Sequence, residues 1–354
     1  MRSVGSPGMQ VERVHDSDRW NRFVTRHSGP VFDLWEWGRL CERYGHDVTY
    51  LGAAEDGDLC GVVPLVHMRS RVLGDKLVSM PYSEYGSIVL ASEAPPETTS
   101  RLLASVREMA DELDVAFVSL RGRDLTNAPT AGFERKRRFV TFEIGLEDGD
   151  SDAVWDALDS SRRGHVRTGR ENGLTVRQAT SIEDLRRYYG LYLDNMQNFG
   201  TPPHSFGFFE QLWSEFGDRM DIDLAEHDGS LVNGQIVLFS RDTCFHWGAV
   251  SDHAHRDLQG GSLLLWDSLE RAAEEDYSSY SLGRTREGTG VYSFKKSWGG
   301  KKVWFDDYHY FPSGTVTLPN PDDETYDRLS DTWQRLPRRA TKWIGPSIRK
   351  NISL

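Results

Sequence analysis

The sequence predicts an α/β (α+β) fold in which two copies of one module follow each other, each a mixed sheet flanked by helices. Two observations predict it. In both halves a short apolar helix pattern ends at a glycine and is followed by an Asp-Gly pair, and the spacing from Gly45 to Asp56 equals that from Gly217 to Asp228. Each half then carries a longer helix pattern that leads into a short apolar run ending at an arginine. Recurrence of these features in one order indicates an internal repeat.

The first module is predicted from its apolar periodicity. Apolar residues on one face predict a helix over residues 32–44, which ends at a glycine suited to a helix C-terminus. Strands are predicted over 48–53 and 59–67, because an Asp-Gly pair between two apolar runs is typical of a tight hairpin. A longer helix over 96–113 and a strand over 115–121 complete the module.

The second module repeats these elements. A short helix is predicted over 208–216, followed by strands over 222–226 and 231–240 with an Asp-Gly turn between them. A helix over 262–276, with apolar residues at helical spacing, leads into a strand over 278–284. This order of helix, hairpin, strands, helix and strand resembles that of the GNAT superfamily of acyltransferases.

Domain boundaries are predicted from linker composition. The stretch Gly145–Ser151 is acidic and contains Gly, Asp and Ser, which suits a linker. We therefore expect a first GNAT-like domain over residues 1–147, a second over 148–312 and a C-terminal tail over 313–354. A helix over 182–198, apolar on one face, is expected to open the second domain.

The composition is acidic and poor in lysine. The chain carries a formal net charge of −12, and only eight of its 42 Lys and Arg residues are Lys. This composition is typical of a protein from a high-salt cytoplasm, and it equally fits a GC-rich genome that prefers Arg codons. Stability that stays unchanged down to low KCl would remove the halophile interpretation. An acidic chain is a poor non-specific binder of nucleic acid, so no DNA partner is expected.

Compartment and metal binding are predicted from what the sequence lacks. No stretch approaches the roughly eighteen apolar residues of a membrane span, and the first ten residues hold no apolar signal region. Cys41, Cys60 and Cys244 show no C-x-x-C spacing, which favours a reducing cytoplasm over disulfides or structural zinc. The histidines within residues 246–255 have no Cys or carboxylate at a convincing ligand spacing, so no metal site is expected.

The segment Leu282–Gly299 is the strongest candidate for a ligand site. It follows a predicted strand and is rich in Gly, so its backbone amides can approach a ligand closely. Arg284, Arg286, Lys295 and Lys296 add cations suited to phosphate groups. Half of the chain's Lys residues fall in or just after this segment. The alternative is a solvated strand edge protected by Lys.

The matching place in the first half is Ser79–Gly86. Its aromatic residues Tyr82 and Tyr85 flank Glu84, and they can form either a ligand wall or a packed loop. Glu84 and Glu287 are the candidates for a general base, because a carboxylate, directly or through a water, can remove a proton from an attacking amine. For each of them the alternative is an ordinary surface acid.

The segment after Gly283 resembles the FemAB-like family, the peptidoglycan interpeptide-bridge enzymes of the lipid II:glycine glycyltransferase type, and in particular members associated with PEP-CTERM and exopolysaccharide systems. The family pattern GR-x-x-x-GTG-x-x-x-FKK-x-WG is matched by Gly283–Arg284, Gly288–Gly290, Phe294–Lys296 and Trp298–Gly299. Supporting matches at Gly61–Leu65, Ser79–Gly86, Gly200–Pro202 and Ile344–Pro346 extend the resemblance over nearly the whole chain.

The resemblance implies two tandem GNAT-like (acyl-CoA N-acyltransferase) domains with an active cleft at or near their junction. It also implies transfer of an aminoacyl or acyl group to an amine of an envelope precursor, a polysaccharide or a small molecule. We expect no permanently bound cofactor and a donor that is aminoacyl-tRNA or acyl-CoA. The residues expected to bind donor or acceptor are Tyr82, Tyr85, Arg121, Arg284, Arg286, Thr289, Gly290, Tyr292, Lys295, Lys296 and Trp298.

Two other functions stay open. One is an acetyl-CoA-dependent GNAT N-acetyltransferase that acts on a sugar amine or a small metabolite. The usual acyl-CoA loop, [QR]-x-x-G-x-[GA], is only approximated by Arg256–Gly261, where Gln259 stands in the place of the first glycine. The other is a non-catalytic partner of envelope assembly, which predicts that neither donor binds.

The C-terminal tail is basic and amphipathic. Residues 331–354 mix Trp333 and Trp343 with several Arg and Lys residues. Such a segment can lie on an anionic membrane surface, and it can equally dock on its own protein or on a partner. The expected location is therefore cytoplasmic, with peripheral contact at the inner face of the membrane as an open alternative.

Overall fold

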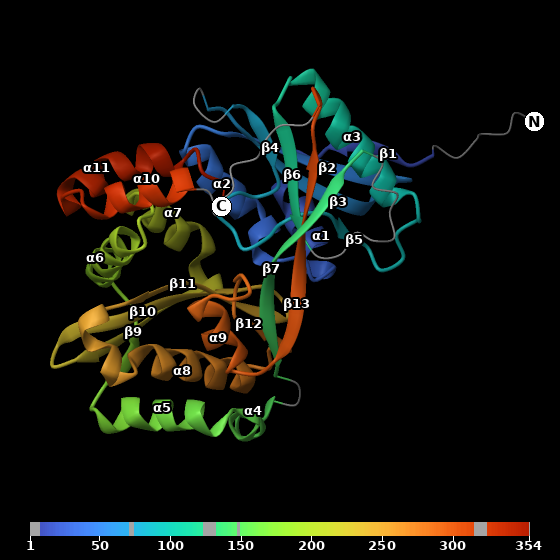
Figure 1. Cartoon of the computed structure of the whole chain (residues 1–354). Coiled ribbons are helices and arrows are strands. Elements are labelled where there is room, and N and C mark those ends of the chain that lie inside the picture. Colours follow the sequence, from blue (N-terminus) through green and yellow to red (C-terminus); the bar gives the residue numbers. More distant parts are fainter. Residues whose placement is uncertain (1–7, 71–73, 123–131, 147–148, 315–323, 354) are drawn as a thin grey trace, which may run out of the picture. The chain divides into compact units, whose positions relative to one another are not determined.

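The computed structural model describes residues 8–70, 74–122, 132–146, 149–314 and 324–353 (Figure 1). The chain divides into two compact units. Unit 1 comprises Met1–Phe139, Trp304–Thr317 and Asn351–Leu354, and unit 2 comprises Val140–Val303 and Leu318–Lys350. Strands β7 (Glu134–Gly145) and β13 (Lys301–Tyr310) each contribute residues to both units.

Unit 1 contains a mixed sheet with helices on both faces. Its strands follow the order β1-β2-β3-β4-β6-β13, and β5 pairs with β3. Strand β4 is parallel to β6, whereas the pairs β1–β2, β2–β3, β3–β4, β3–β5 and β6–β13 are antiparallel. Its remaining elements are β1 (Gln10–Arg13), α1 (Ser17–Arg26), η1 (Val31–Asp33), α2 (Trp35–Arg43), β2 (Asp47–Glu55), β3 (Asp58–Met68), β4 (Lys76–Val78), β5 (Val89–Leu90), α3 (Thr98–Glu112) and β6 (Phe117–Gly122).

The sequence of β2 explains how unit 1 covers its sheet. Successive side chains of a strand point to opposite faces. Leu51 and Ala53 enter the core that α3 closes, whereas Tyr50 stacks on Trp35 and contacts Trp20 from α2 and α1. The two faces therefore receive different helices.

Unit 2 has a sheet in the order β8-β9-β10-β11-β12-β7. Helix α8 packs against one face with α4 and α5 behind it, and α6 packs against the other face (Figure 1). The elements are α4 (Ser151–Ala157), α5 (Ser160–Glu171), β8 (Thr175–Gln178), α6 (Ile182–Asn198), α7 (Phe206–Phe216), η3 (Gly217–Arg219), β9 (Met220–His227), β10 (Ser230–Phe239), β11 (Thr243–Ser251), η4 (His253–Leu258), α8 (Gly260–Glu274), β12 (Ser279–Ser281), α9 (Gly290–Lys296), α10 (Glu324–Gln334) and α11 (Arg338–Arg349).

The predicted repeat is confirmed strand by strand. The β2–β3 hairpin of unit 1 matches the β9–β10 hairpin of unit 2, and the parallel pair β4–β6, joined through α3, matches β11–β12, joined through α8. Both Asp-Gly turns have positive φ at both residues, 51° and 91° at Asp56 and Gly57, and 48° and 76° at Asp228 and Gly229. That geometry suits the twist of a two-residue hairpin, which is why the pair recurs.

The units divide the chain differently from the predicted domains. Residues 306–310 of β13 pair with β6, so this end of the strand belongs to unit 1. The predicted boundaries assign it instead to a second domain that ends at residue 312. Residues 143–145 of β7 pair with β12, so unit 2 begins before the predicted linker. The predicted boundary at 147/148 itself lies outside the described residues. Backbone pairing between distant segments, rather than linker composition, sets these boundaries.

The predicted tail does not form a separate segment. Gln197 Nε2 donates to the Leu336 carbonyl at 2.7 Å, and Arg338 Nη2 donates to the Gly190 carbonyl at 2.6 Å, which ties α11 and the residues just before it to α6 in unit 2. The last residues belong to unit 1, where Lys76 Nζ donates to the Asn351 carbonyl at 2.8 Å. The tail therefore docks on its own chain.

Two local predictions need correction. The helix predicted over 32–44 is divided into η1 and α2, because Leu34 between them is extended (ψ 153°). The Gly-rich segment Leu282–Gly299, for which no helix is predicted from the sequence, contains helix α9. The Thr289 hydroxyl caps this helix by accepting from the Tyr292 amide at 3.1 Å, a favourable start that outweighs the glycines before it.

Candidate functional site

Unit 2 has a fork between its parallel strands β11 and β12. Only Thr243–Phe245 of β11 pair with β12, at Ser279–Ser281. Residues 246–251 pair with β10 on one side, and in the described part of the chain no strand pairs with their other side. The ladder ends at the carboxyl end of β12, while β11 continues to Ser251, and the carboxyl ends of strands are where open α/β sheets bind ligands. We call residues 246–251 and the facing segment 282–285 the fork of unit 2.

Helix α8 begins directly after the fork. Gln259 is left-handed (φ 60°, ψ 28°), so this residue adopts the conformation that the acyl-CoA loop usually assigns to a glycine. Gly260 lies so close to Asn233 that an added Cβ would meet Asn233 Oδ1 at 2.1 Å, whereas a Cβ on Gly261 would have 3.5 Å of space. The first amides of a helix have no partner within the helix and favour anions. This turn can therefore hold a phosphate group.

A buried polar chain leads to the fork. Its end is His246, whose Nε2 lies 3.1 Å from Gln235 Oε1. Gln235 Nε2 donates to Asp223 Oδ2 at 3.0 Å, and Arg271 Nη2 donates to Asp223 Oδ1 at 2.7 Å. Burial, with a smaller effect of the Lys295 cation, lowers the pKa of His246 to about 3, so its ring is neutral at physiological pH. Sequence reasoning considered this histidine only as a metal ligand.

The predicted cationic segment borders the fork through short contacts. Lys295 Nζ donates to the Arg284 carbonyl at 3.2 Å. Thr289 caps α9, so that Gly290 begins the helix, and the Tyr292 ring meets that of Phe142 at 5.4 Å between centroids. The structure thus brings together the predicted residues of this segment around α9.

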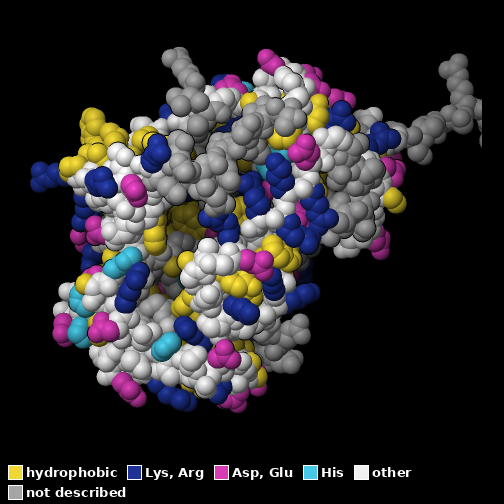
Figure 2. Space-filling view, in the orientation of Figure 1, with side chains coloured by type: hydrophobic (Ala, Val, Ile, Leu, Met, Phe, Trp, Pro, Cys, Tyr) yellow, Lys and Arg dark blue, Asp and Glu magenta, His cyan; other side chains and the backbone are white. Residues whose placement is uncertain are grey.

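The remaining predicted cations differ in accessibility. Arg284 and Arg286 are half-buried, whereas Lys296 is exposed. Basic side chains gather in places on the face shown in Figure 2, although the chain as a whole is acidic. The overall charge therefore does not prevent anion binding at a local site.

Glu287 and Trp298, two other predicted residues of this segment, have surroundings that are typical of structural roles. Glu287 is exposed and pairs with Lys302 on the surface. Trp298 is only 1 % exposed and packs near the Phe294 ring, at 6.1 Å between centroids. The roles of Glu287 as a base and of Trp298 as a donor contact stay predictions. Their surroundings favour an ion-pair role for Glu287 and a core position for Trp298.

In unit 1 the segment Ser79–Gly86 is a packed and strained loop. Met80 and Tyr82 have positive φ, 34° and 68°, which costs free energy in a non-glycine residue. Tyr82 and Tyr85 are buried, and the Tyr82 hydroxyl lies 2.8 Å from His46 Nε2. Of the two interpretations of this segment, the packed loop fits their burial better than the ligand wall.

Arg121 lies inside this loop. It is 2 % exposed, and its Nη2 donates to the Met80 carbonyl at 2.9 Å. Its amide donates to Ser79 Oγ at 2.9 Å, and its carbonyl accepts from the Gly86 amide at 2.9 Å. The predicted contact between Arg121 and the acyl donor stays a prediction. The hydrogen bonds described above all join Arg121 to the loop 79–86. Glu84, the other predicted base, is half-buried in the same loop.

Sequence reasoning missed Asp33, whose carboxylate is buried beside this loop. Asp33 is 0 % exposed, and the Ser87 backbone amide is a polar group that interacts with its carboxylate. Burial raises the pKa of this carboxyl well above its usual range. The apolar periodicity around it placed the residue in a helix but carried no signal for its burial.

Metal-ligand clusters and membrane-spanning helices are both absent from the described residues. None of their His, Cys, Asp and Glu side chains form a group of three or more suited to a metal ion. Among the helices that the structure describes, none is both long and apolar enough to cross a membrane.

The two matching sheets make the chain a repeat of one mixed-sheet module. Residues 158–296, within unit 2, match the family described as the acetyltransferase (GNAT) domain. The matched range includes the fork, the start of α8 and helix α9.

Solved structures share this fold over most of the chain. FemX is 15% identical with a TM-score of 0.69 and covers 83% of this chain and 96% of its own. L-PGS from Bacillus licheniformis is 13% identical with a TM-score of 0.57, covering 91% and 98%. A tandem GNAT protein from the clavulanic acid biosynthesis pathway is 14% identical with a TM-score of 0.56, covering 87% and 100%. At these identities the likeness shows the fold. Comparison with curated protein sequences finds no match.

Proposed function

We propose that the chain is an N-acyltransferase that binds an activated acyl or aminoacyl donor at the fork of unit 2. It transfers the acyl group to an amine of a cell-envelope or surface-polysaccharide precursor. The observation that carries the proposal is the end of the β11–β12 ladder at Phe245 and Ser281, with β11 leading through η4 to the start of α8. Parallel strands that separate beside free helix amides provide both an opening for a donor and a site for its phosphates.

The proposed transfer is sequential and has no covalent enzyme intermediate. The amine nitrogen attacks the carbonyl carbon of the donor ester or thioester, and the hydroxyl or thiol of the donor leaves. Holding both reactants at the fork supplies much of the rate enhancement. Glu84 or Glu287, directly or through a water, takes the proton of the ammonium group, and backbone amides stabilise the developing oxyanion.

The cations of α9 provide the main test. Replacing Lys295 and Lys296 together by Ala is expected to weaken donor binding by about 1.5–3 kcal/mol for each lost charge-assisted bond. The control variant Lys136→Ala/Arg219→Ala removes the same charge from exposed positions outside the fork. Calorimetry with CoA and with aminoacyl-tRNA measures the effect. Unchanged donor binding and turnover in the Lys295/Lys296 variant would reject the assignment.

Acetyl-CoA is a second candidate donor, favoured by one observation. Gln259 departs from the acyl-CoA loop in sequence, but its left-handed backbone matches the turn that a glycine would form there. Binding of CoA without binding of charged tRNA would support an N-acetyltransferase acting on a sugar amine or a small metabolite. Binding of neither donor would favour the non-catalytic partner.

A further inference from the structure

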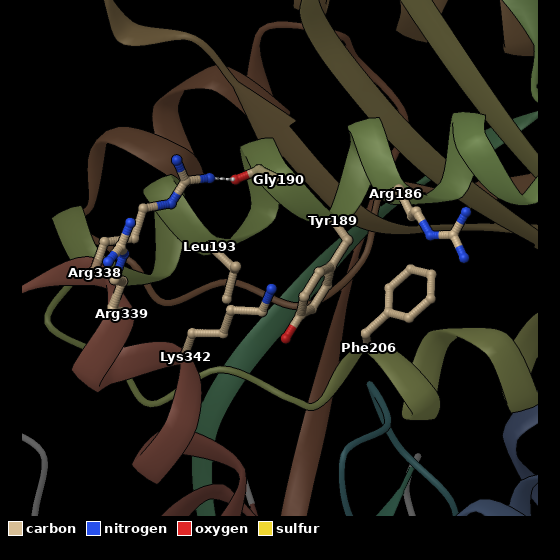
Figure 3. Close-up of a pocket in the computed structure, with 8 residues that line it drawn as sticks. All are labelled: Arg186, Tyr189, Gly190, Leu193, Phe206, Arg338, Arg339 and Lys342. Carbon is tan, nitrogen blue, oxygen red and sulfur yellow. Dashed lines mark hydrogen bonds between the residues drawn. The ribbon is translucent and has the colours of Figure 1, made fainter.

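A second candidate site lies in unit 2 between α6, α7 and α11. A pocket of about 490 Å³ opens there (Figure 3). This volume is in the range of small-molecule sites. The residues of interest in its lining are Arg186, Tyr189, Phe206, Arg338, Arg339 and Lys342.

Two of the four cations of this α6/α11 pocket are neutralised. Arg186 Nη1 pairs with Glu183 at 3.2 Å, and Arg338 Nε pairs with Asp194 at 2.9 Å. Arg338 also donates to the Gly190 carbonyl at 2.6 Å, so its role is to hold α11 against α6. Glu183 and Asp194 therefore balance the charges of Arg186 and Arg338. They do not balance those of the other two cations, Arg339 and Lys342.

The other two cations are exposed and belong to the lining of the pocket. Neither Arg339 nor Lys342 pairs with a carboxylate of any residue that the structure describes. Lys342 Nζ instead lies 6.0 Å from the centroid of the Tyr189 ring, toward which it extends in Figure 3. In a chain of net charge −12, two uncompensated cations at one pocket create a local preference for an anion.

The wall beside these cations is aromatic and fixed. The Tyr189 hydroxyl donates to the His204 carbonyl at 3.0 Å, and the Tyr189 and Phe206 rings lie 5.3 Å apart at their centroids. Arg186 Cζ lies 5.8 Å from the Phe206 centroid, which closes the far side. The pocket therefore offers cations for a phosphate and an apolar surface for the group that the phosphate carries.

We propose that the α6/α11 pocket binds the phosphate group of a phosphate ester, at a site distinct from the fork. The Arg339 guanidinium can donate two parallel hydrogen bonds to phosphate oxygens, and Lys342 adds a point charge. The ester is either a soluble molecule or the head group of an anionic lipid. Trp343, 86 % exposed on α11 next to Lys342, supplies an interfacial side chain in the second case.

The test uses the full chain and the variant Arg339→Ala/Lys342→Ala. Both side chains are exposed, so the variant is expected to fold. Calorimetry with glycerol 3-phosphate probes a soluble ester, and co-sedimentation with vesicles of phosphatidylglycerol, compared with phosphatidylcholine, probes a head group. We expect the wild type to bind in at least one of the two assays and the variant to bind about tenfold or more weakly there. The charge-matched control is Arg219→Ala/Arg335→Ala, at exposed positions outside the pocket.

The results separate the two sources. Binding of glycerol 3-phosphate that Trp343→Ala leaves unchanged indicates a soluble ester, and vesicle binding weakened by Trp343→Ala indicates a head group. The proposal is overturned if the wild type binds neither probe, or if the control variant loses as much binding as the pocket variant. Because the fork is not altered, either outcome leaves the proposed acyl transfer to be judged by its own donor assays.

Discussion

The two units share one strand order but differ where their parallel strands meet. Both ladders have three residue pairs, Lys76–Val78 with Phe117–Ser119 in unit 1 and Thr243–Phe245 with Ser279–Ser281 in unit 2. Beyond the ladder of unit 1 the chain folds back, and Gly86 bridges to Arg121. Beyond the ladder of unit 2 β11 continues to Ser251, and within the described residues no strand pairs with that side of it.

This difference shows how one module can keep a ligand opening while its copy fills it. In unit 1 the space is occupied by the loop 79–86 and by the buried Arg121 side chain. In unit 2 the matching arginine, Arg284, is half-buried, and its carbonyl accepts from Lys295. The space that the fork leaves open for the proposed donor in unit 2 is filled in unit 1.

The largest expected effect comes from blocking the start of α8. The change Gly261→Glu places a carboxylate at the helix amides, where 3.5 Å of space is available for the new Cβ. We expect donor affinity to fall by more than about 100-fold, because the new charge repels donor phosphates and competes for the amides. The matched change in unit 1, Ser100→Glu near the start of α3, is expected to leave donor binding unchanged. Equal losses in both variants, measured by calorimetry, would break the proposed difference between the units.

Arginine substitutions sharpen the comparison by separating stability from binding. Arg121→Ala removes a buried donor to the Met80 carbonyl and is expected to lower the free energy of unfolding by about 3 kcal/mol. Arg284→Ala is expected to cost less stability and to weaken donor binding instead, because its side chain is partly accessible at the fork. Chemical denaturation and donor titration of both variants measure the split. A larger stability loss for Arg284→Ala would contradict it.

Buried histidines make both units sensitive to acid. Burial lowers the pKa of His246 in unit 2 to about 3 and of His309 in unit 1 to about 4, from an ordinary value of 6.5. The unfolded chain therefore binds more protons below pH 6.5. Stability is full above that pH and falls by about 1.4 kcal/mol per pH unit for each histidine as the pH drops. His246→Gln should flatten this slope in denaturation curves measured between pH 7 and 4.5, and an unchanged slope would show that His246 is not held neutral.

The smallest effect is expected from the buried carboxyl of unit 1. Because burial raises the pKa of Asp33 in the folded state, its contribution to stability is full at acidic pH and is lost as the pH rises above its unfolded value of 3.8. Asp33→Asn removes this dependence and is expected to stabilise the protein by about 1 kcal/mol at pH 8. The exposed Asp58→Asn serves as the control in thermal denaturation at pH 5 and 8. A destabilised Asp33→Asn variant would indicate that the carboxylate is ionised and paired.

The parts of the fold that depend on local sequence could be predicted. The Asp-Gly turns follow from the backbone freedom of Gly57 and Gly229, and α6 has the predicted bounds because its periodicity and its Ser181 cap agree. The pairing of β13 with β6 could not be predicted, because it joins segments far apart in the chain and no local pattern encodes the partner.

The candidate site could be predicted only in part. The cations around α9 stand out in the sequence because Lys is scarce. Burial of Trp298 and Arg121 depends on tertiary packing that residue type does not determine. The position of the fork depends on where the ladder between β11 and β12 ends. The sequence pattern of β11 gives no sign that only its first three residues pair with β12.

Each sheet is completed by a strand that the chain supplies out of order. The sixth strand of the first sheet is β13, which follows all the strands of the second sheet in the chain, and the sixth strand of the second sheet is β7, which precedes the other five. A single cut between the modules therefore cannot release two intact halves, since each fragment would lose a strand and expose an open edge. The same connectivity would result from fusing the two chains of a dimer that exchanged their last strands, which offers an evolutionary route from a single-module ancestor.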